Sequence, residues 1–187
     1  MNLKYDQLEF TLNVRGEENI KFDKVIFLDV DGVLNTESYS NPIIHEDRIK
    51  RLKNIVDETQ AKIVMSSSWK HRYKYFIKDP NLIKSESDKK DMQFLKDLLD
   101  KYNLTIMDYT PSFGTGPDAR PGEIRAWLVD KPNVKTFVIL DDDDFWKWNW
   151  LESYFVMTKR TINKYDKIRG LEDDNVIQAI KILNQKN

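Results

Sequence analysis

Short runs of apolar residues alternate along the chain with longer segments in which apolar residues recur at helical spacing. The short runs have the length of buried strands, and they are VIFL at 25–28, AKIVM at 61–65, LTIMDY at 104–109, TFVIL at 136–140 and YFVM at 154–157. The run at 25–28 is apolar throughout, which is typical of a strand that is covered on both faces. It is therefore predicted to lie at the centre of a sheet.

Four helices are predicted between and after these strands, because their apolar residues fall on one helical face. Those residues are Ile49, Leu52, Ile55 and Val56; Met92, Leu95, Leu98, Leu99 and Tyr102; Ile124, Trp127 and Leu128; and Val176, Ala179, Ile180 and Leu183. The third helix is predicted to start beside Pro121, since proline is favoured in a first turn. Strands and helices in this alternating order predict an α/β domain with an open, mainly parallel sheet.

Three segments lack these patterns. Residues 1–23 are predicted to form an N-terminal extension with a short hairpin or edge strand, ahead of a domain that spans 24–187. The polar and aromatic segment 71–87 is predicted to be a loop with at most one irregular turn. Residues 110–122, which are rich in glycine and proline, are predicted to be a second loop.

The composition excludes several classes of protein. The chain has 187 residues, the size of one compact domain. Its 30 Lys and Arg residues balance 31 Asp and Glu residues, so there is no overall basic field for nucleic acid or a membrane. The absence of cysteine excludes disulfides, thiolate zinc sites and a cysteine nucleophile. No segment approaches the roughly 18 apolar residues of a membrane span, so a soluble, cytoplasmic protein is expected.

Polar side chains follow three of the predicted strands. Asp29 and Asp31 follow the first, the serines at 66–68 follow the second, and Asp141 and Asp142 follow the fourth. Ligands of open α/β sheets bind outside the carboxyl ends of the strands, so these side chains should share one crevice. Carboxylates crowded together must either take up protons or share a cation. Mg²⁺ fits a set of oxygen ligands best, and all four aspartates are predicted to hold it.

The two aspartates of the first strand end have separate predicted roles. Asp29 is a plausible nucleophile toward phosphorus, forming an aspartyl-phosphate. Asp31 would protonate the leaving oxygen and later activate water. Gly32 would let the backbone turn sharply beneath a bound phosphate. A simple strand-end turn, for which Asp-Gly is common, is the alternative, but the agreement of three strand ends favours catalysis.

The segments FLDVDGVLN, IVMSSSW and VILDDDD resemble motifs I, II and IV of the haloacid dehalogenase (HAD) superfamily of phosphohydrolases. With GEIRAWL, they are most similar to the phosphatase-like domain of bacterial and phage RNA-repair proteins, a group near the polynucleotide 3'-phosphatases. The resemblance implies a three-layer α/β/α Rossmann-like fold. It also implies these roles: Asp29 as nucleophile, Asp31 as acid and base, Ser66 as phosphate-binding hydroxyl, and Asp141 with Asp142 as the acidic metal-site pair.

The resemblance leaves two residue assignments undecided, the phosphate-binding serine and the motif III cation. Ser67 could replace Ser66, because the run of serines leaves the register undecided. Most members of the superfamily use a lysine in motif III, whereas here Arg120 stands at the corresponding place. Its guanidinium can neutralise phosphoryl oxygens through bidentate contacts. Arg125 and Lys131 are the alternatives for this role.

A basic and aromatic stretch follows the serines. Trp69, Lys70 and Arg72 are predicted to form a rim around the site, and a helix start with solvated charges is the alternative. Trp69 and Lys70 are predicted to contact substrate, as are Gly32 and Ser67. The later segment FWKWNW at 145–150 could stack on bases, or it could pack its tryptophans over the sheet.

In the family that the chain resembles, cap domains are inserted after motif I or between motifs II and III. The corresponding intervals here, 36–61 and 71–119, are occupied by core elements, so an essentially capless site is expected. An open crevice favours a phosphorylated macromolecule, with a nucleic-acid 3'-phosphate as first choice and phosphoprotein as second. A non-catalytic nucleic-acid-binding module is the alternative from another class. A receiver-like signalling domain would arrange its acidic residues differently.

Overall fold

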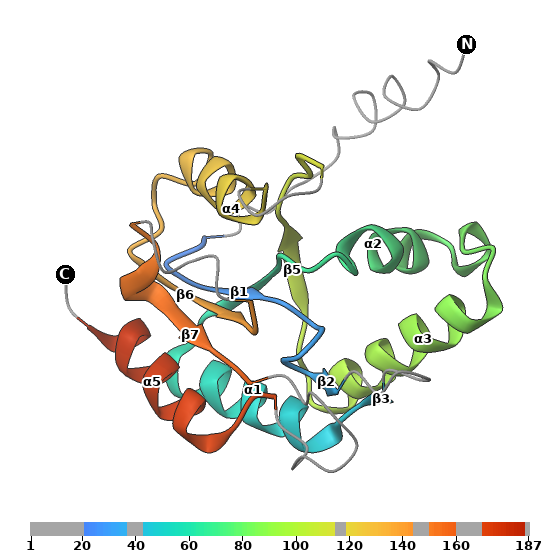
Figure 1. Cartoon of the computed structure of the whole chain (residues 1–187), viewed down its shortest axis with the longest axis horizontal. Coiled ribbons are helices and arrows are strands. Elements are labelled where there is room, and N and C mark those ends of the chain that lie inside the picture. The colour runs from blue at the N-terminus through green and yellow to red at the C-terminus, as the bar shows by residue number, and fades with distance from the viewer. Residues whose placement is uncertain (1–20, 37–42, 115–118, 144–149, 160–169, 186–187) are drawn as a thin grey trace.

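A five-stranded parallel sheet forms the centre of the computed structural model of the protein (Figure 1). The structure describes residues 21–36, 43–114, 119–143, 150–159 and 170–185. The strands are β1 (Lys24–Leu28), β4 (Lys62–Met65), β5 (Ile106–Tyr109), β6 (Thr136–Asp141) and β7 (Phe155–Met157). Their order in the sheet is β5-β4-β1-β6-β7, and every pair is parallel. The predicted central position of β1 and the α/β class are confirmed.

The strands bury both faces, and alternate residues point to opposite sides. From β1, Ile26 and Leu28 face one hydrophobic core, whereas Val25 and Phe27 face a second core on the other side. The second core contains Trp127, whose ring meets Phe27 edge to face. Two cores separated by one sheet give the three-layer α/β/α arrangement that the resemblance implies.

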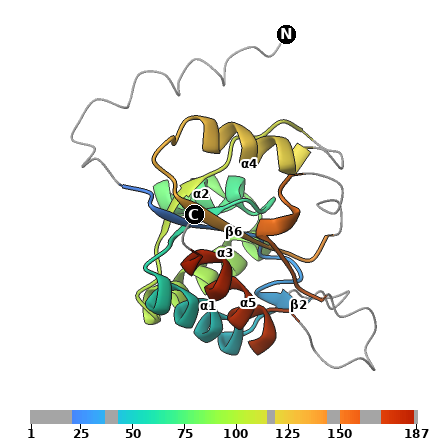
Figure 2. The same ribbon diagram turned by 90° about the vertical axis from the view of Figure 1, so that its left-hand side faces the viewer.

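The helices cover the two faces unequally. The helices α1 (Glu46–Thr59), α3 (Glu86–Lys101) and α5 (Asp173–Asn184) lie on one side of the sheet, and α4 (Ala119–Val129) lies on the other (Figures 1 and 2). All four follow the predicted apolar faces. The helix α4 begins two residues before Pro121, so this proline lies in its first turn as expected.

The prediction of a loop over 71–87 is wrong. The chain forms the helix α2 (Lys70–Lys78) and a short 3₁₀ helix η2 (Pro80–Leu82) there. The buried face of α2 consists of Lys70, Tyr73 and Phe76. The buried lysine interrupts the apolar face of α2, although Tyr73 and Phe76 keep the helical spacing of buried residues.

The connection between β1 and α1 carries no large insertion among the residues that are described. It contains the two-residue strands β2 (Asn35–Thr36) and β3 (Ile43–Ile44), which pair antiparallel. Between β4 and β5, α2 and α3 pack against the first core. The expectation of an essentially capless domain is confirmed. The predicted hairpin within 1–23 and most of the tryptophan-rich segment lie outside the described residues.

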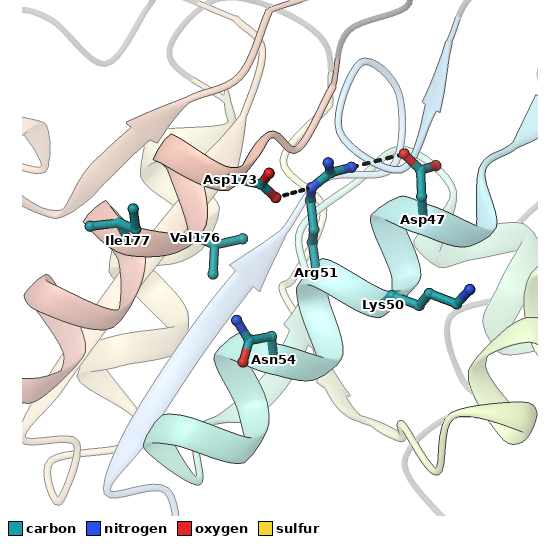
Figure 3. Close-up of a pocket in the computed structure, with 7 residues that line it drawn as sticks. All are labelled: Asp47, Lys50, Arg51, Asn54, Asp173, Val176 and Ile177. Atoms are coloured by element: carbon teal, nitrogen blue, oxygen red, sulfur yellow. Dashed lines mark hydrogen bonds and ion pairs between the residues drawn. The ribbon is translucent and has the colours of Figure 1, made fainter.

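A groove runs between α1 and α5, on the side of the sheet opposite α4 (Figure 3). Arg51 of α1 lies between two carboxylates there, 2.8 Å from Asp47 Oδ2 and 2.6 Å from Asp173 Oδ1. This pairing ties the start of α5 to α1. None of the helices in the described part of the chain has both the length and the apolar character needed to cross a membrane.

Candidate active site

The ends of β1, β4 and β6 bring the predicted site residues together. The backbone N–H of Asp29 donates to the carbonyl of Leu140 at 3.0 Å, and that of Ser66 donates to the carbonyl of Leu28 at 3.0 Å. The chain passes from β1 to β4 on one side and later returns to β6 on the other, so this edge is the topological switch point of the sheet. The geometry agrees with the predicted crevice.

Three carboxylates meet at this point. One oxygen from each of Asp29, Asp141 and Asp142 lies within 4.8 Å of the others. Asp29 and Asp141 are buried, and the Arg120 Nη1 atom lies between them, 3.2 Å from Asp29 Oδ1 and 2.5 Å from Asp141 Oδ2. Buried like charges this close are costly unless a cation neutralises them.

The electrostatics of this group favour uptake of positive charge. Burial raises the pKa of Asp29 to about 8, and the Asp141 carboxylate adds to the rise, although Arg120 and a hydrogen bond from Ser67 oppose it. Burial likewise raises the pKa of Asp141 to about 6, against the opposing effect of Arg120. Burial lowers the pKa of Arg120, but Asp29 and Asp141 more than reverse this effect and raise it overall. Asp29 therefore favours its protonated form at neutral pH unless a cation replaces the proton, whereas Asp141 is mostly ionised.

These shifts predict how the stability of the metal-free protein changes with pH. Between an ordinary value of 3.8 and about 8, Asp29 holds a proton in the folded chain but not in the unfolded chain. Stability must therefore fall as the pH rises through this range. In the presence of a chelator, we expect the melting temperature to drop by about 5 °C or more from pH 5 to pH 8.

Added Mg²⁺ should reverse most of this drop at pH 8, because it binds the ionised carboxylates of the folded state. In Asp29→Asn the drop should be much smaller, since the amide does not titrate. A melting temperature that is unchanged by pH and by Mg²⁺ in the wild type would contradict the site.

Gly32 permits the close approach of Asp142. Its φ is 64°, and a Cβ atom built on it would lie 2.0 Å from Asp142 Oδ2. A side chain at this position would displace that carboxylate, so the backbone requires glycine. The Thr158 hydroxyl, at the end of β7, donates to the Gly32 carbonyl at 2.9 Å and fixes the turn from the other side. The sharp turn predicted at Gly32 is confirmed, and its contact with substrate stays a prediction.

The carboxylate of Asp31 is held apart from the other three. The indole Nε1 of Trp69 donates to both of its oxygens at 3.0 Å, and Asn35 Nδ2 donates to Oδ1 at 2.7 Å. Asp31 is not a member of the carboxylate group above. Asp31 thus lies outside the carboxylates that converge, and the expectation that its side chain helps to hold a metal stays a prediction. The predicted role of Asp31 as a general acid and base is compatible with this position.

The predicted rim of Trp69 and Lys70 is corrected for Trp69, whereas Lys70 does line the cleft and its contact with substrate stays a prediction. Trp69 is only 2% exposed and packs in the core, so its ring offers no open stacking surface. Lys70 is buried, and its Nζ donates to Glu123 Oε2 at 2.6 Å, to the Pro111 carbonyl at 2.9 Å and to Thr110 Oγ1 at 3.1 Å. Burial lowers the pKa of Lys70, although Glu123 opposes this effect. Lys70 thus joins α2, the segment after β5 and α4.

The two candidate serines differ in their partners. The Ser66 hydroxyl is buried, has no hydrogen-bond partner among the described residues and lines a cleft of about 520 Å³. The Ser67 hydroxyl accepts a hydrogen bond from the Trp69 backbone at 3.2 Å and does not line this cleft. The geometry favours Ser66 for binding an oxyanion.

The cation of motif III is best matched by Arg120. It lines the same cleft as Ser66 and contacts Asp29 and Asp141. Arg125 is exposed one turn further along α4. Lys131 lies 3.9 Å from Asp108 and 5.8 Å from the centre of the Trp127 ring, beside the second core. These placements single out Arg120 from the three alternatives.

The residues present fit a hard divalent cation. Oxygen ligands from Asp29, Asp141 and Asp142 converge, and Gly32 leaves room for one of them. Mg²⁺ prefers a few carboxylates and completes its shell with water or phosphate. Sequence reasoning missed Asn35, Thr158 and Glu123. Asn35 lies within the quoted segment FLDVDGVLN and Glu123 lies within GEIRAWL, but nothing in the pattern links Thr158 to the site.

Comparison with known proteins agrees with this site. The family model for the HAD domain in Swiss Army Knife RNA repair proteins matches residues 25–176. The matched span runs from β1 into α5 and includes all the residues of the site described above. No curated protein and no solved structure matched the chain. Because the match covers more than half of the sequence, the chain belongs to the family of HAD domains found in Swiss Army Knife RNA repair proteins.

Proposed function

We propose that the protein is a Mg²⁺-dependent phosphomonoester hydrolase that works through an aspartyl-phosphate on Asp29. The observation that carries this proposal is the buried group of Asp29, Asp141 and Asp142 beside Arg120 at the switch point of the sheet. Membership of the HAD family supports a phosphatase-type activity. The unpartnered Ser66 hydroxyl beside Arg120 supplies a donor for a phosphoryl oxygen.

The residues divide the reaction into two displacements. In the first, an Asp29 oxygen bonds to phosphorus while the ester bond breaks, and Asp31 gives its proton to the leaving oxygen. In the second, Asp31 takes a proton from water, the water oxygen bonds to phosphorus, and Asp29 is released with inorganic phosphate. Arg120 and Ser66 neutralise and orient the phosphoryl oxygens throughout. Mg²⁺, held by Asp29, Asp141 and Asp142, would offset the negative charge that gathers on the phosphoryl group.

The proposed substrate is the 3'-phosphate of a nucleic-acid strand. The family is described by its place in RNA repair proteins, which supports a phosphorylated nucleic-acid end. The essentially capless site leaves room for a strand to leave the cleft. Phosphoprotein is the second choice, and a protein that only binds nucleic acid would not need the buried carboxylates.

A comparison of substrates tests this proposal. Phosphate release should be measured with oligonucleotides bearing a 3'- or a 5'-phosphate, with sugar phosphates and with a phosphotyrosine peptide, each with Mg²⁺ and with chelator. We expect the 3'-phosphate oligonucleotide to have the highest kcat/KM and chelator to abolish turnover. Faster turnover of the peptide than of every oligonucleotide would replace the nucleic-acid substrate with phosphoprotein. No release from any substrate would exclude a phosphatase.

The contact between Trp69 and Asp31 predicts that removing it lowers activity on some substrates and not on others. Trp69→Phe keeps a large apolar ring in the core but removes the Nε1 donor that orients Asp31. We expect kcat on an alkyl phosphate to fall about tenfold, because its leaving oxygen needs the proton from Asp31. On an activated aryl phosphate the loss should be within about twofold, since that leaving group needs little protonation.

The half-exposed Trp150, which packs edge to face on Phe137, provides a matched control. Trp150→Phe should change neither rate. Equal losses on both substrates in Trp69→Phe would mean that the indole supports the fold rather than the acid.

A further inference from the structure

An exposed aromatic side chain lies beside the cleft. Phe113 is 58% exposed, and its neighbours Ser112 and Gly114 both line the cleft that contains Ser66 and Arg120. Leaving a phenylalanine ring in water forgoes the free energy that its burial would supply. With Trp69 in the core, Phe113 is the aromatic residue beside the cleft that offers an accessible ring face among the residues described.

The backbone at Phe113 is held firmly. Its N–H donates to Glu123 Oε1 at 3.0 Å, and the other oxygen of Glu123 accepts from Lys70. Lys70 also binds the carbonyl of Pro111, so one buried ion pair anchors the segment on both sides of Ser112. A ring carried by an anchored backbone loses little further freedom when it binds a ligand.

The ring also has a defined place relative to the phosphate-binding groups. It packs beside Gly122, where an added Cβ would lie 3.5 Å from Phe113 Cδ2. Gly122 follows Arg120 by two residues in the first turn of α4. The ring therefore packs on the helical turn that also carries Arg120.

Polar side chains line the cleft itself. Ser112 Oγ lies 2.7 Å from His71 Nε2, and the exposed Ser68 also lines the cleft. Hydroxyls in the cleft and an aromatic ring beside it match a sugar joined to a base. Lys70 and Arg120 both have carboxylate partners, and Glu123 and Asp143 add negative charge to the wall. Contacts to further phosphates are therefore a poor source of affinity in this cleft.

We propose that Phe113 stacks on the base of the terminal nucleotide whose 3'-phosphate is bound by Ser66 and Arg120. This inference rests on the proposed function and assigns a base-binding position to the same site. Stacking accepts any base, because every base presents a π face. The protein would then recognise the end of a strand through its last base and phosphate, with little preference for sequence.

An abasic substrate isolates this contact. We would compare an oligonucleotide 3'-phosphate with the same oligonucleotide whose terminal nucleoside lacks its base, using wild type and Phe113→Ala. We expect Phe113→Ala to lower kcat/KM about tenfold on the base-bearing end and less than about twofold on the abasic end. Phe113→Trp should restore the activity. Phe94→Ala, which removes a similarly exposed ring from α3, is the matched control and should behave as wild type.

Three outcomes would overturn the proposal. Phe113→Ala could leave kcat/KM unchanged on both ends, or lower it equally on both, and either result denies a contact with the base. Wild type could also fail to favour the base-bearing end over the abasic end. A wild-type protein that releases no phosphate from any substrate would instead overturn the proposed function itself, so the two failures are distinguishable.

Discussion

Asp29→Asn is expected to lower Mg²⁺-dependent phosphate release by at least about 10⁴-fold, because an amide replaces both the nucleophile and a metal ligand. The fold should persist, since the two side chains have the same shape and the change removes a buried carboxylate. Phosphate release and thermal melting should be measured on the same preparation. In chelator at pH 8, we expect the variant to melt no lower than the wild type.

Asp143→Asn provides the control for this change. Asp143 follows the carboxylate group and lines the cleft, but it is not a member of the group itself. Its substitution should cost less than about tenfold in activity. If Asp29→Asn kept activity near that of the wild type, another residue would have to carry the phosphoryl group.

Arg120→Ala is expected to lower kcat/KM by about 10²- to 10³-fold, the usual cost of removing a donor that stabilises a transition state. The guanidinium contacts Asp29 and Asp141 and lines the cleft beside Ser66, so it is placed to meet phosphoryl oxygens. Its removal also leaves two buried carboxylates facing each other, so activity should be measured at saturating Mg²⁺. Arg120→Lys should recover part of the loss, since it keeps the charge but not the planar fork.

The other two cations considered for motif III test the specificity of this effect. Arg125 is exposed on α4, and Lys131 lies beside the Trp127 ring. Alanine at either position should leave kcat/KM within about twofold of the wild type. A loss at Arg125 or Lys131 that matches the loss at Arg120 would show that the motif III cation is misassigned.

The architecture could be predicted because buried strands and amphipathic helices leave clear patterns. VIFL at 25–28 became the central strand, and the helices with repeating leucine and isoleucine lie where their apolar faces indicate. The missed helix α2 has a physical reason. Its buried face includes Lys70, whose charge is compensated by Glu123, a residue 53 positions away. Trp69, Tyr73 and Phe76 do recur at helical spacing, and that stripe was the signal that could have revealed α2.

The site could be predicted in part for a similar reason. Parallel strands end at a common edge, so Asp29, Ser66 and Asp141 were expected to meet. The orientation of each carboxylate could not be predicted, because it depends on side-chain donors that the fold brings to it. Asp31 accepts hydrogen bonds from Trp69, 38 positions away, as well as from the nearby Asn35, and it lies outside the group formed by the other three carboxylates. The Trp69 indole, which the sequence suggested as a contact for substrate, is a buried hydrogen-bond donor in the structure.

Covalent labelling of Asp29 tests the proposed mechanism most directly. The Asp31→Asn variant should still allow attack on an activated aryl phosphate, but it should be slow to activate the water that releases phosphate. With Mg²⁺ and such a substrate, followed by acid quench, borohydride reduction and peptide mass analysis, we predict modification at Asp29. The double variant Asp29→Asn, Asp31→Asn should carry none. Phosphate release without any modification of Asp29, or modification at another residue, would contradict an aspartyl-phosphate mechanism at this site.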